Sequence, residues 1–369
     1  MRLLWVELRD FRNHRLTRLE EVPKGLLVVV GPNGEGKTNL LEGMSYLFTL
    51  SSPRVSSNQP LVREGAEAGY VRGEVETAVG RVLVEVEIPG SGRASKVLVN
   101  RSPVRRKRDL RRDIRAVFFG PDDLDIVRGD PSQRRRFMDE ALGALWPVKD
   151  AAVTGYERAL RQRNRLLKEW EGRGMPEAME AWDAELVEAG SALMRARSDA
   201  VGSLSPSAGR GFEWLAGYGL TCVYRPSVWA EGDQAALEAA FRTRIDERRQ
   251  DELIRRTSLV GPHRDELELA VRDLGARSFG SHGEAWAAAL CLRLGLADAV
   301  QEEIGEPPVL LLDDPFSALD PQRQGKVAEH LAGRGQVFIS VADEAHVPPS
   351  AEAILDVSSG DVTLRGAAR

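Results

Sequence analysis

The sequence has few of the features that would place it outside the cell or in a membrane. Only two cysteines occur in 369 residues, Cys222 and Cys291, and their spacing fits neither a disulfide framework nor a metal site. No apolar run approaches the roughly 20 residues that cross a bilayer. The first residues, MRLLWVELRDF, alternate as a strand does and lack the apolar core and cleavage site of a signal peptide. We therefore expect a cytoplasmic protein without membrane attachment.

The chain also lacks an excess of positive charge. It holds 51 Lys and Arg against 56 Asp and Glu, which gives a net charge of −5. Binding to nucleic acid would therefore have to come from a local basic patch. Hydrophobic residues at 42% and charged residues at 29% are typical of a globular protein, and the length suits two domains or one large domain with an insertion.

What the chain does contain is a glycine-rich turn between an apolar run and a helical pattern. The stretch GPNGEGKT follows Leu26–Val30 and has the spacing of a phosphate-binding loop. The glycines let backbone amides face phosphates, Lys37 reaches the β and γ oxygens, and the Thr38 hydroxyl suits Mg²⁺. We therefore expect ATP and Mg²⁺ as cofactors. The predicted nucleotide-binding residues here are Gly31, Pro32, Asn33, Gly34, Glu35, Gly36, Lys37 and Thr38.

A second part of the nucleotide site is predicted far along the chain. The apolar stretch PVLLLDD predicts a buried strand that ends at Asp313. Because α/β sheets bind ligands at the carboxyl ends of their strands, this carboxylate would lie beside the Mg²⁺. Asp314, the next residue, is suited to orient the attacking water. The predicted catalytic residues are Lys37, Asp313 and Asp314, and the predicted metal ligands are Thr38 and Asp313.

The periodicity predicts an α/β nucleotide domain that is split by an insertion. Residues 70–100 alternate apolar and polar side chains, which indicates an antiparallel β meander. Two charged amphipathic helices follow Val148, and we favour an ordinary helical lobe over a dedicated protein-docking arm. The expected parts are a head segment with the phosphate loop and meander (1–147), an inserted, mainly helical lobe (148–255) and a second head segment (256–369).

Two further stretches resemble motifs of ABC-type ATPases. SALD, directly after the acidic pair, resembles their D-loop, and SFGSHGEAWAAALCLRLGLA resembles their signature motif. Ser281 and Gly283 open a predicted helix whose N-terminus is suited to a phosphate, and both are candidate nucleotide-binding residues. In such ATPases this helix belongs to the other subunit, so the resemblance implies that two protomers share each ATP.

Larger segments resemble the RecF family of SMC-like ABC-type ATPases. These are LRDFRNH, GEGKTNLLE, PDDLDIVRGDPSQRRRFMDEAL, YERALRQRN, LVGPHRDELEL and LLLDDPFSALD. The resemblance implies an ABC/SMC-head-like P-loop domain with a helical lobe, an ATP-dependent homodimer and weak, DNA-stimulated ATP hydrolysis. It also implies binding to single-stranded or gapped DNA, and work with RecO and RecR in loading RecA during DNA repair and replication.

The sequence departs from the family pattern at three places. His282, Glu284, Ala285 and Trp286 stand where the signature usually has glutamines and an arginine. The threonine-rich switch is reduced to residues 340–343, and residues 49–65 lack a serine–histidine–arginine sequence. These departures bear on the phosphate contacts from the partner protomer and on the hydrolysis rate, and they leave the phosphate loop itself intact.

One basic stretch is the candidate DNA contact. Residues 93–115 hold ten basic and two acidic residues, and such a patch neutralises phosphates without reading sequence. The alternative is a solvated surface. The predicted DNA-binding residues are Arg105, Arg106, Lys107 and Arg108. Of Arg134–Arg136, at least one is expected to brace the domain, and His263, Arg264 and Asp265 form either an ion-paired corner or a contact near the nucleotide.

Two other classes of function stay open at this point. The ATPase subunit of a membrane transporter is usually shorter, with a fuller glycine-rich signature and a histidine after the last strand, where this chain has Asp343. A P-loop phosphotransferase for a small substrate would leave the D-loop and the signature-like helix unexplained. A DNA repair ATPase would respond to DNA with faster ATP turnover, whereas the other two would not.

Overall fold

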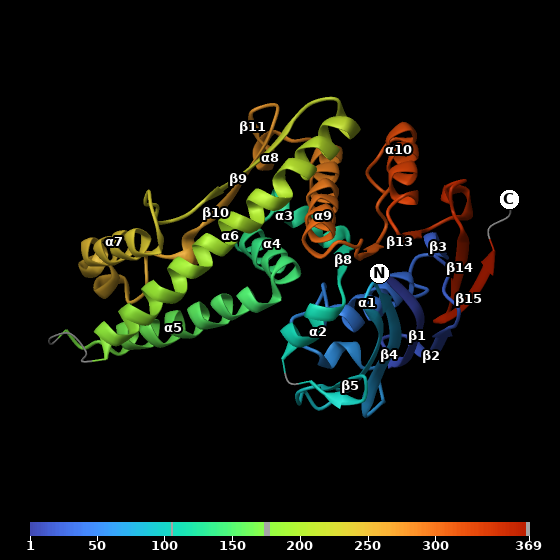
Figure 1. Cartoon of the computed structure of the whole chain (residues 1–369), viewed down its shortest axis with the longest axis horizontal. Coiled ribbons are helices and arrows are strands. Elements are labelled where there is room, and N and C mark those ends of the chain that lie inside the picture. The colour runs from blue at the N-terminus through green and yellow to red at the C-terminus, as the bar shows by residue number, and fades with distance from the viewer. Residues whose placement is uncertain (105, 173–177, 367–369) are drawn as a thin grey trace. The chain divides into compact units, whose positions relative to one another are not determined.

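The computed structural model describes residues 1–104, 106–172 and 178–366 (Figure 1). The chain forms two compact units. The first comprises residues 1–124, 207–219 and 280–369, and the second comprises residues 125–206 and 220–279. The division falls inside helix α6 (Met179–Ala216), between Pro206 and Ser207. The three parts expected from the sequence, with boundaries after residues 147 and 255, remain a prediction.

The first unit contains an antiparallel sheet with the strand order β2-β1-β4-β5-β6-β7. Its strands are β1 (Arg2–Phe11), β2 (His14–Leu19), β4 (Ala68–Thr77), β5 (Gly80–Pro89), β6 (Lys96–Val99) and β7 (Ser102–Pro103). Every second residue of β4 is buried because apolar and small residues alternate with polar ones along it. The meander predicted for residues 70–100 is thereby confirmed.

The second sheet of this unit is mainly parallel and has the order β15-β14-β3-β13-β12-β8. Its strands are β3 (Gly25–Val30), β8 (Ala116–Phe119), β12 (Val309–Leu312), β13 (Gln336–Val341), β14 (Ala353–Ser358) and β15 (Asp361–Gly366). Strand β13 is buried at every position, as expected for a continuous apolar run in a parallel sheet. Because β3 pairs with β13 and β14, the two ends of the chain build one nucleotide domain.

Helix α1 (Lys37–Thr49) contacts strands of both sheets of this unit, and its side chains join them in one apolar core (Figure 1). The unit also holds α2 (Lys107–Asp113), α9 (His282–Ile304), α10 (Pro321–Ala332) and the end of α6. Helix α9 is capped at its C-terminus by Gly305, whose positive φ of 77° suits glycine. Of the helices in the described ranges, none is long and apolar enough to cross a membrane.

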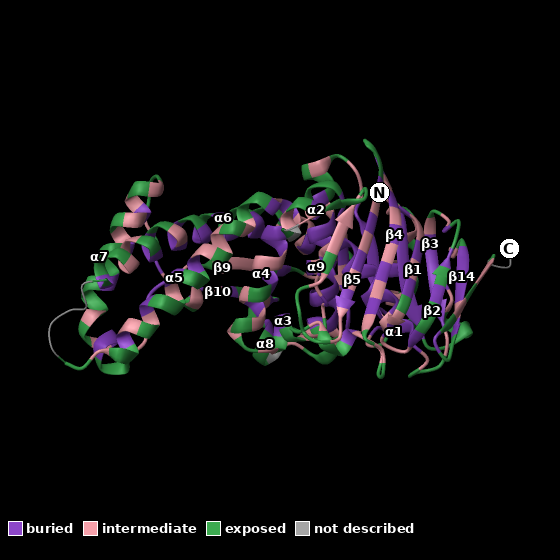
Figure 2. Ribbon diagram, turned by 90° about the horizontal axis from the view of Figure 1, so that it is seen from below, coloured by how far each residue is buried: buried purple, intermediate pink, exposed green. Residues whose placement is uncertain are grey.

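The second unit is mainly helical and has a small sheet of order β11-β10-β9. Its elements are α3 (Leu124–Arg128), α4 (Pro131–Leu145), α5 (Asp150–Glu169), the first part of α6, β9 (Leu220–Arg225), α7 (Gln234–Arg255), β10 (Glu266–Val271), β11 (Leu274–Gly275) and α8 (Ala276–Phe279). Figure 2 shows that α5 and α7 each have exposed and buried faces. The fully buried Arg163 on α5 bonds to Asp183 on α6 and Glu252 on α7, both at 2.6 Å. This arginine therefore ties the three helices together.

Candidate nucleotide site

The phosphate-loop sequence lies between β3 and α1, in a conformation that requires glycine at two positions. Gly31 has φ of 158°, and a Cβ there would lie 2.3 Å from the backbone oxygen of Val357. Gly36, the residue before α1, has φ of 117°. Residues with a side chain rarely adopt such a φ. The strand, the loop and the helix start are therefore combined as the sequence predicts.

Lys37 folds back over this loop. Its Nζ donates to the backbone oxygens of Gly31 at 2.6 Å and Pro32 at 2.9 Å. Burial lowers the pKa of Lys37, while the carboxylates of Asp313, Asp314 and Glu35 act in the opposite direction. The first amides of α1 have no partners within the helix, as at any helix start. An ammonium group, free amides and glycines without side chains together fit the phosphates of ATP.

The loop is held from outside by two turns. From the turn between β1 and β2, Asn13 Nδ2 donates to Glu35 O at 2.9 Å, and His14 Nε2 lies 3.1 Å from Gly36 O. From the turn between β14 and β15, the amide of Gly360 donates to Glu35 O at 3.0 Å. Asn13 and His14 belong to the LRDFRNH stretch, yet sequence reasoning assigned neither of them a role in the site.

The acidic residue at the end of β12 meets the phosphate loop as predicted. Asp313 is 4% exposed, and its Oδ2 accepts a 2.8 Å hydrogen bond from the Thr38 hydroxyl. Its Oδ1 accepts a 2.6 Å bond from Ser340 at the end of β13, a residue that sequence reasoning did not single out as a ligand. A hydroxyl and a carboxylate fit Mg²⁺, which takes few protein oxygens and completes its shell with phosphate and water.

Asp314 has a different environment from its neighbour. Its backbone is left-handed, with φ of 51°, and its amide donates to Ser340 Oγ at 2.8 Å. Burial raises the pKa of Asp314, the negative Asp313 raises it further, and Lys37 and His346 act against this. A carboxylate with a raised pKa beside one that fits a metal ion is suited to accept a proton from water.

The start of α9 is already engaged within the chain. Ser281 Oγ accepts from the amide of Glu284 at 3.2 Å, and Glu284 Oε2 accepts from the amide of Ser281 at 2.7 Å. Tyr218 donates to the other oxygen of Glu284 at 2.6 Å. Gly283 is tightly placed, since a Cβ there would lie 3.2 Å from Ala318 O in the SALD stretch. Within the described ranges no hydrogen bond links Ser281 or Gly283 to the phosphate loop.

Three of the predicted DNA-binding residues, Arg106, Lys107 and Arg108, lie at the start of α2. Arg106 is exposed and Arg108 is half-buried; Lys107 begins the helix, and Arg105 lies outside the described residues. Further along, the nearly buried Arg115 has its pKa lowered to about 10 by burial and by the neighbouring Arg111. The stretch therefore combines exposed cations with one that is packed into the unit.

Two other motifs have structural roles in the second unit. Arg134 donates to both carboxylate oxygens of Glu266, from Nε at 2.5 Å and from Nη2 at 2.8 Å. The prediction that an arginine of this run braces the domain is therefore confirmed. The fully buried Asp265 accepts from Tyr224 at 2.5 Å and from Arg197 at 3.1 Å. Of the two alternatives for this motif, the structure therefore shows the ion-paired corner.

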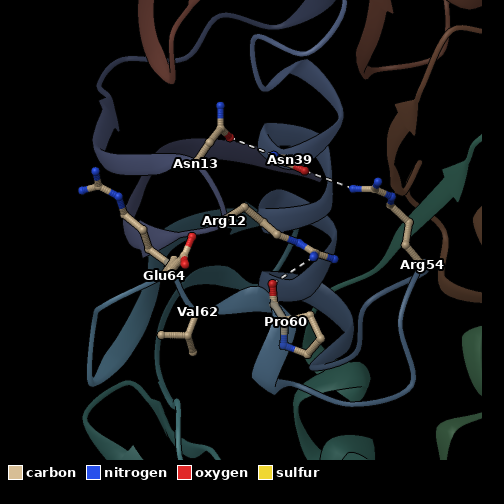
Figure 3. A pocket seen from close by; sticks show the side chains of 8 residues that line it. Arg12, Asn13, Asn39, Arg54, Pro60, Val62 and Glu64 are labelled. Atoms are coloured by element: carbon tan, nitrogen blue, oxygen red, sulfur yellow. Dashed lines mark hydrogen bonds between the residues drawn. The ribbon is translucent and has the colours of Figure 1, made fainter.

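An open surface cavity of about 690 Å³ lies next to residues that hold or follow the phosphate loop (Figure 3). It is lined by Arg12, Asn13, Asn39, Arg54, Pro60, Val62, Arg63 and Glu64. Asn13 also holds the loop, and Asn39 lies in the first turn of α1, next to Thr38. The cavity therefore adjoins residues that hold or follow the phosphate loop. None of its three arginines was predicted as a site residue.

Comparison with known proteins agrees with these features. Residues 2–362 match the family model of the RecF/RecN/SMC N terminal domain. The DNA replication and repair protein RecF of Streptomyces avermitilis is 41% identical over 358 residues, which cover 94% of this chain and 95% of that protein. The protein of the same name from Frankia alni is 40% identical over 362 residues, which cover 94% and 95%.

Solved structures give the same result. The recombination mediator protein RecF with ATP, described as part of the RecFOR pathway, has a TM-score of 0.90 at 27% identity, covering 99% of this chain and 97% of that chain. The Smc head domain of Pyrococcus furiosus, at 16% identity with a TM-score of 0.57 and coverage of 99% and 96%, shares the fold. The predicted fold class is confirmed, and the transporter alternative finds no support. The chain belongs to the RecF family.

Proposed function

We propose that this protein is an ATP-hydrolysing, DNA-binding protein of DNA replication and repair. The observation that carries the proposal is the hydrogen bond between Thr38 and Asp313, residues 275 positions apart that the fold brings together at the phosphate loop. A phosphate loop without an acidic partner would be compatible with a simple anion site, whereas this pair is suited to metal-dependent phosphate chemistry.

Each residue of the site has a distinct role in the proposed reaction. Lys37 binds the β and γ phosphates, and Thr38 and Asp313 would hold Mg²⁺, which neutralises phosphate charge when bound. Ser340 fixes the rotamer of Asp313 through its 2.6 Å bond. Asp314 orients the attacking water and takes its proton, in keeping with its raised pKa.

The wider activity follows from family membership and from the basic stretch. The protein would dimerise on ATP, with Ser281 and Gly283 of each protomer facing the nucleotide of the other. It would bind single-stranded or gapped DNA through the basic residues 105–108 and act with RecO and RecR in loading RecA. The names of its relatives, which describe DNA replication and repair and the RecFOR pathway, support this part of the proposal.

Two substitutions test the nucleotide chemistry. Lys37→Met removes the charge that faces the phosphates, so we expect ATP binding to be lost in calorimetry. Asp314→Asn keeps the metal ligands Thr38 and Asp313, so we expect binding to persist while phosphate release stops. DNA should raise phosphate release by the wild-type protein. Equal loss of ATP affinity in both variants would contradict this division of roles.

A further inference from the structure

A buried carboxylate on the phosphate-loop helix has no role in the chemistry described above. Glu42 lies on α1 one turn after Thr38, and its side chain is 0% exposed. An ionised carboxylate in such a place is stable only when charged and hydrogen-bonded partners surround it. The structure provides these partners from two segments outside α1, the turn after β1 and the loop after α1.

Both oxygens of Glu42 are engaged. Arg12 forks onto them through Nε at 2.9 Å and Nη2 at 2.8 Å. Arg54 Nη1 approaches Oε2 at 3.3 Å, and the Ser52 hydroxyl donates to Oε1 at 2.6 Å. A two-pronged arginine–carboxylate pair restricts the guanidinium in both position and plane. Glu42 thus determines where two arginines lie.

Both arginines line the same open surface cavity (Figure 3). Arg12 also donates to Pro60 O at 2.8 Å, and Arg54 donates to Asn39 Oδ1 at 3.0 Å. Asn39 in turn donates to Asn13, which holds Glu35 of the loop. A continuous hydrogen-bonded path therefore runs from the phosphate loop to the two arginines.

The ion pairs of Glu42 with Arg12 and Arg54 differ from an ion pair that only stabilises the fold. The Arg54 side chain remains 39% exposed although its partner carboxylate is fully buried. The cavity wall carries the cations Arg12, Arg54 and Arg63 and the acid Glu64. Glu42 and Asp10 offset part of this positive charge from behind, so the partly exposed guanidinium of Arg54 is the group best placed to meet an anion. By contrast, Arg163, which also pairs with two carboxylates, has a fully buried side chain.

We propose that Glu42 is a positioning residue for nucleotide binding: it holds Arg12 and Arg54 in the cavity, where they bind the α-phosphate, next to the β and γ phosphates held by Lys37. This inference rests on the proposed ATP site. It assigns to Glu42 an effect on nucleotide affinity and none on the hydrolysis step, because Asp313 and Asp314 are untouched.

The test measures ATP binding by calorimetry and ATP turnover on the full chain. Glu42→Gln removes the charge that both arginines pair with, so we expect ATP to bind at least about tenfold more weakly, with KM raised and kcat retained. Glu42→Asp, which keeps the charge on a shorter side chain, should recover part of the affinity. Asp298→Asn is the matched control, since it breaks a partly buried ion pair with Arg334 elsewhere in the unit, and it should bind ATP within about twofold of wild type.

A second variant keeps the test independent of folding. Arg54 is partly exposed, so Arg54→Gln should fold normally, and it should weaken ATP binding by a similar factor. The double variant with Glu42→Gln should lose little further affinity if both residues act through the same contact. If Glu42→Gln and Arg54→Gln both bind ATP as wild type does, the pair only stabilises the fold and the inference is wrong. If Lys37→Met also binds ATP normally, the error lies instead in the proposed nucleotide site.

Discussion

Ser340 joins the two acidic residues of the site, and its removal has an effect that the structure allows us to estimate. The serine is 1% exposed, donates to Asp313 Oδ1 at 2.6 Å and accepts from the amide of Asp314 at 2.8 Å. Ser340→Ala would leave a buried carboxylate oxygen and a part-buried amide without this partner. It would also remove the contact that holds Asp314 in its left-handed conformation.

The cost of this substitution is the sum of two terms. A hydrogen bond to a charged group is worth about 1.5–3 kcal/mol, and an amide left unpaired costs about 1–3 kcal/mol. Because water relieves part of both, we expect the strands β12 and β13 to lose about 3 kcal/mol of protection against local opening. Each 1.4 kcal/mol corresponds to about a factor of ten, so amide exchange there should become about a hundredfold faster.

Hydrogen–deuterium exchange of the protein without nucleotide, followed by mass spectrometry, measures this directly. Peptides that cover residues 309–314 and 336–341 should show the faster exchange. Ser191→Ala is the matched control, because Ser191 is also fully buried but its hydroxyl has no hydrogen-bond partner among the residues that the structure describes. That control should leave exchange in β12 and β13 unchanged. An increase of less than about threefold in Ser340→Ala would refute the idea that this serine organises the acidic pair.

Three further outcomes are expected. Replacing the basic residues 105–108 with alanine should make the slope of log DNA affinity against log salt less steep, by about 0.7 for each lost contact with a single-stranded phosphate. An unchanged slope would indicate a solvated surface. Ser281→Arg should bind ATP yet stay monomeric in light scattering. Glu284→Gln removes a negative charge from the start of α9, so it should dimerise with ATP at a lower protein concentration than wild type. Burial lowers the pKa of His263 to about 4, below its value of 6.5 in the unfolded chain, so its contribution to stability is complete above pH 6.5 and is lost as pH falls toward 4. Denaturation at several pH values should show that dependence reduced in His263→Gln.

The sequence was sufficient where a role depends on neighbouring residues or on the order of a parallel sheet. The loop from Gly31 to Thr38 needs only a strand before it and a helix after it, and both are visible as local patterns. The meeting of Thr38 and Asp313 followed from the rule that parallel strands present their carboxyl ends at one edge. The alternation of residues 70–100 predicted the meander for the same local reason.

The residues that sequence reasoning missed are held by turns and by long-range side-chain contacts. Asn13 and His14 reach the phosphate loop because β1 and β2 turn back beside it, and no periodicity encodes that approach. Glu42 looks like an ordinary polar residue of a helix until Arg12 and Arg54 are placed around it. For Asp265, an ion-paired corner was one of two expected roles, but its partners Tyr224 and Arg197 could not be named because they lie 41 and 68 residues away.

The start of α9 presents a different case, because its signal was present in the sequence. Ser281 followed three residues later by Glu284 is the pattern of a capping box, and the structure contains that box. The same serine was predicted to face the phosphate of a partner protomer. Both roles use the hydroxyl and the first amides of one helix, so a phosphate and the Glu284 carboxylate compete for them. Only ATP brings a γ-phosphate to this place. Dimerisation should therefore depend on how much more strongly the helix start binds the γ-phosphate than the Glu284 carboxylate. Glu284 would then set the nucleotide concentration that the dimer needs.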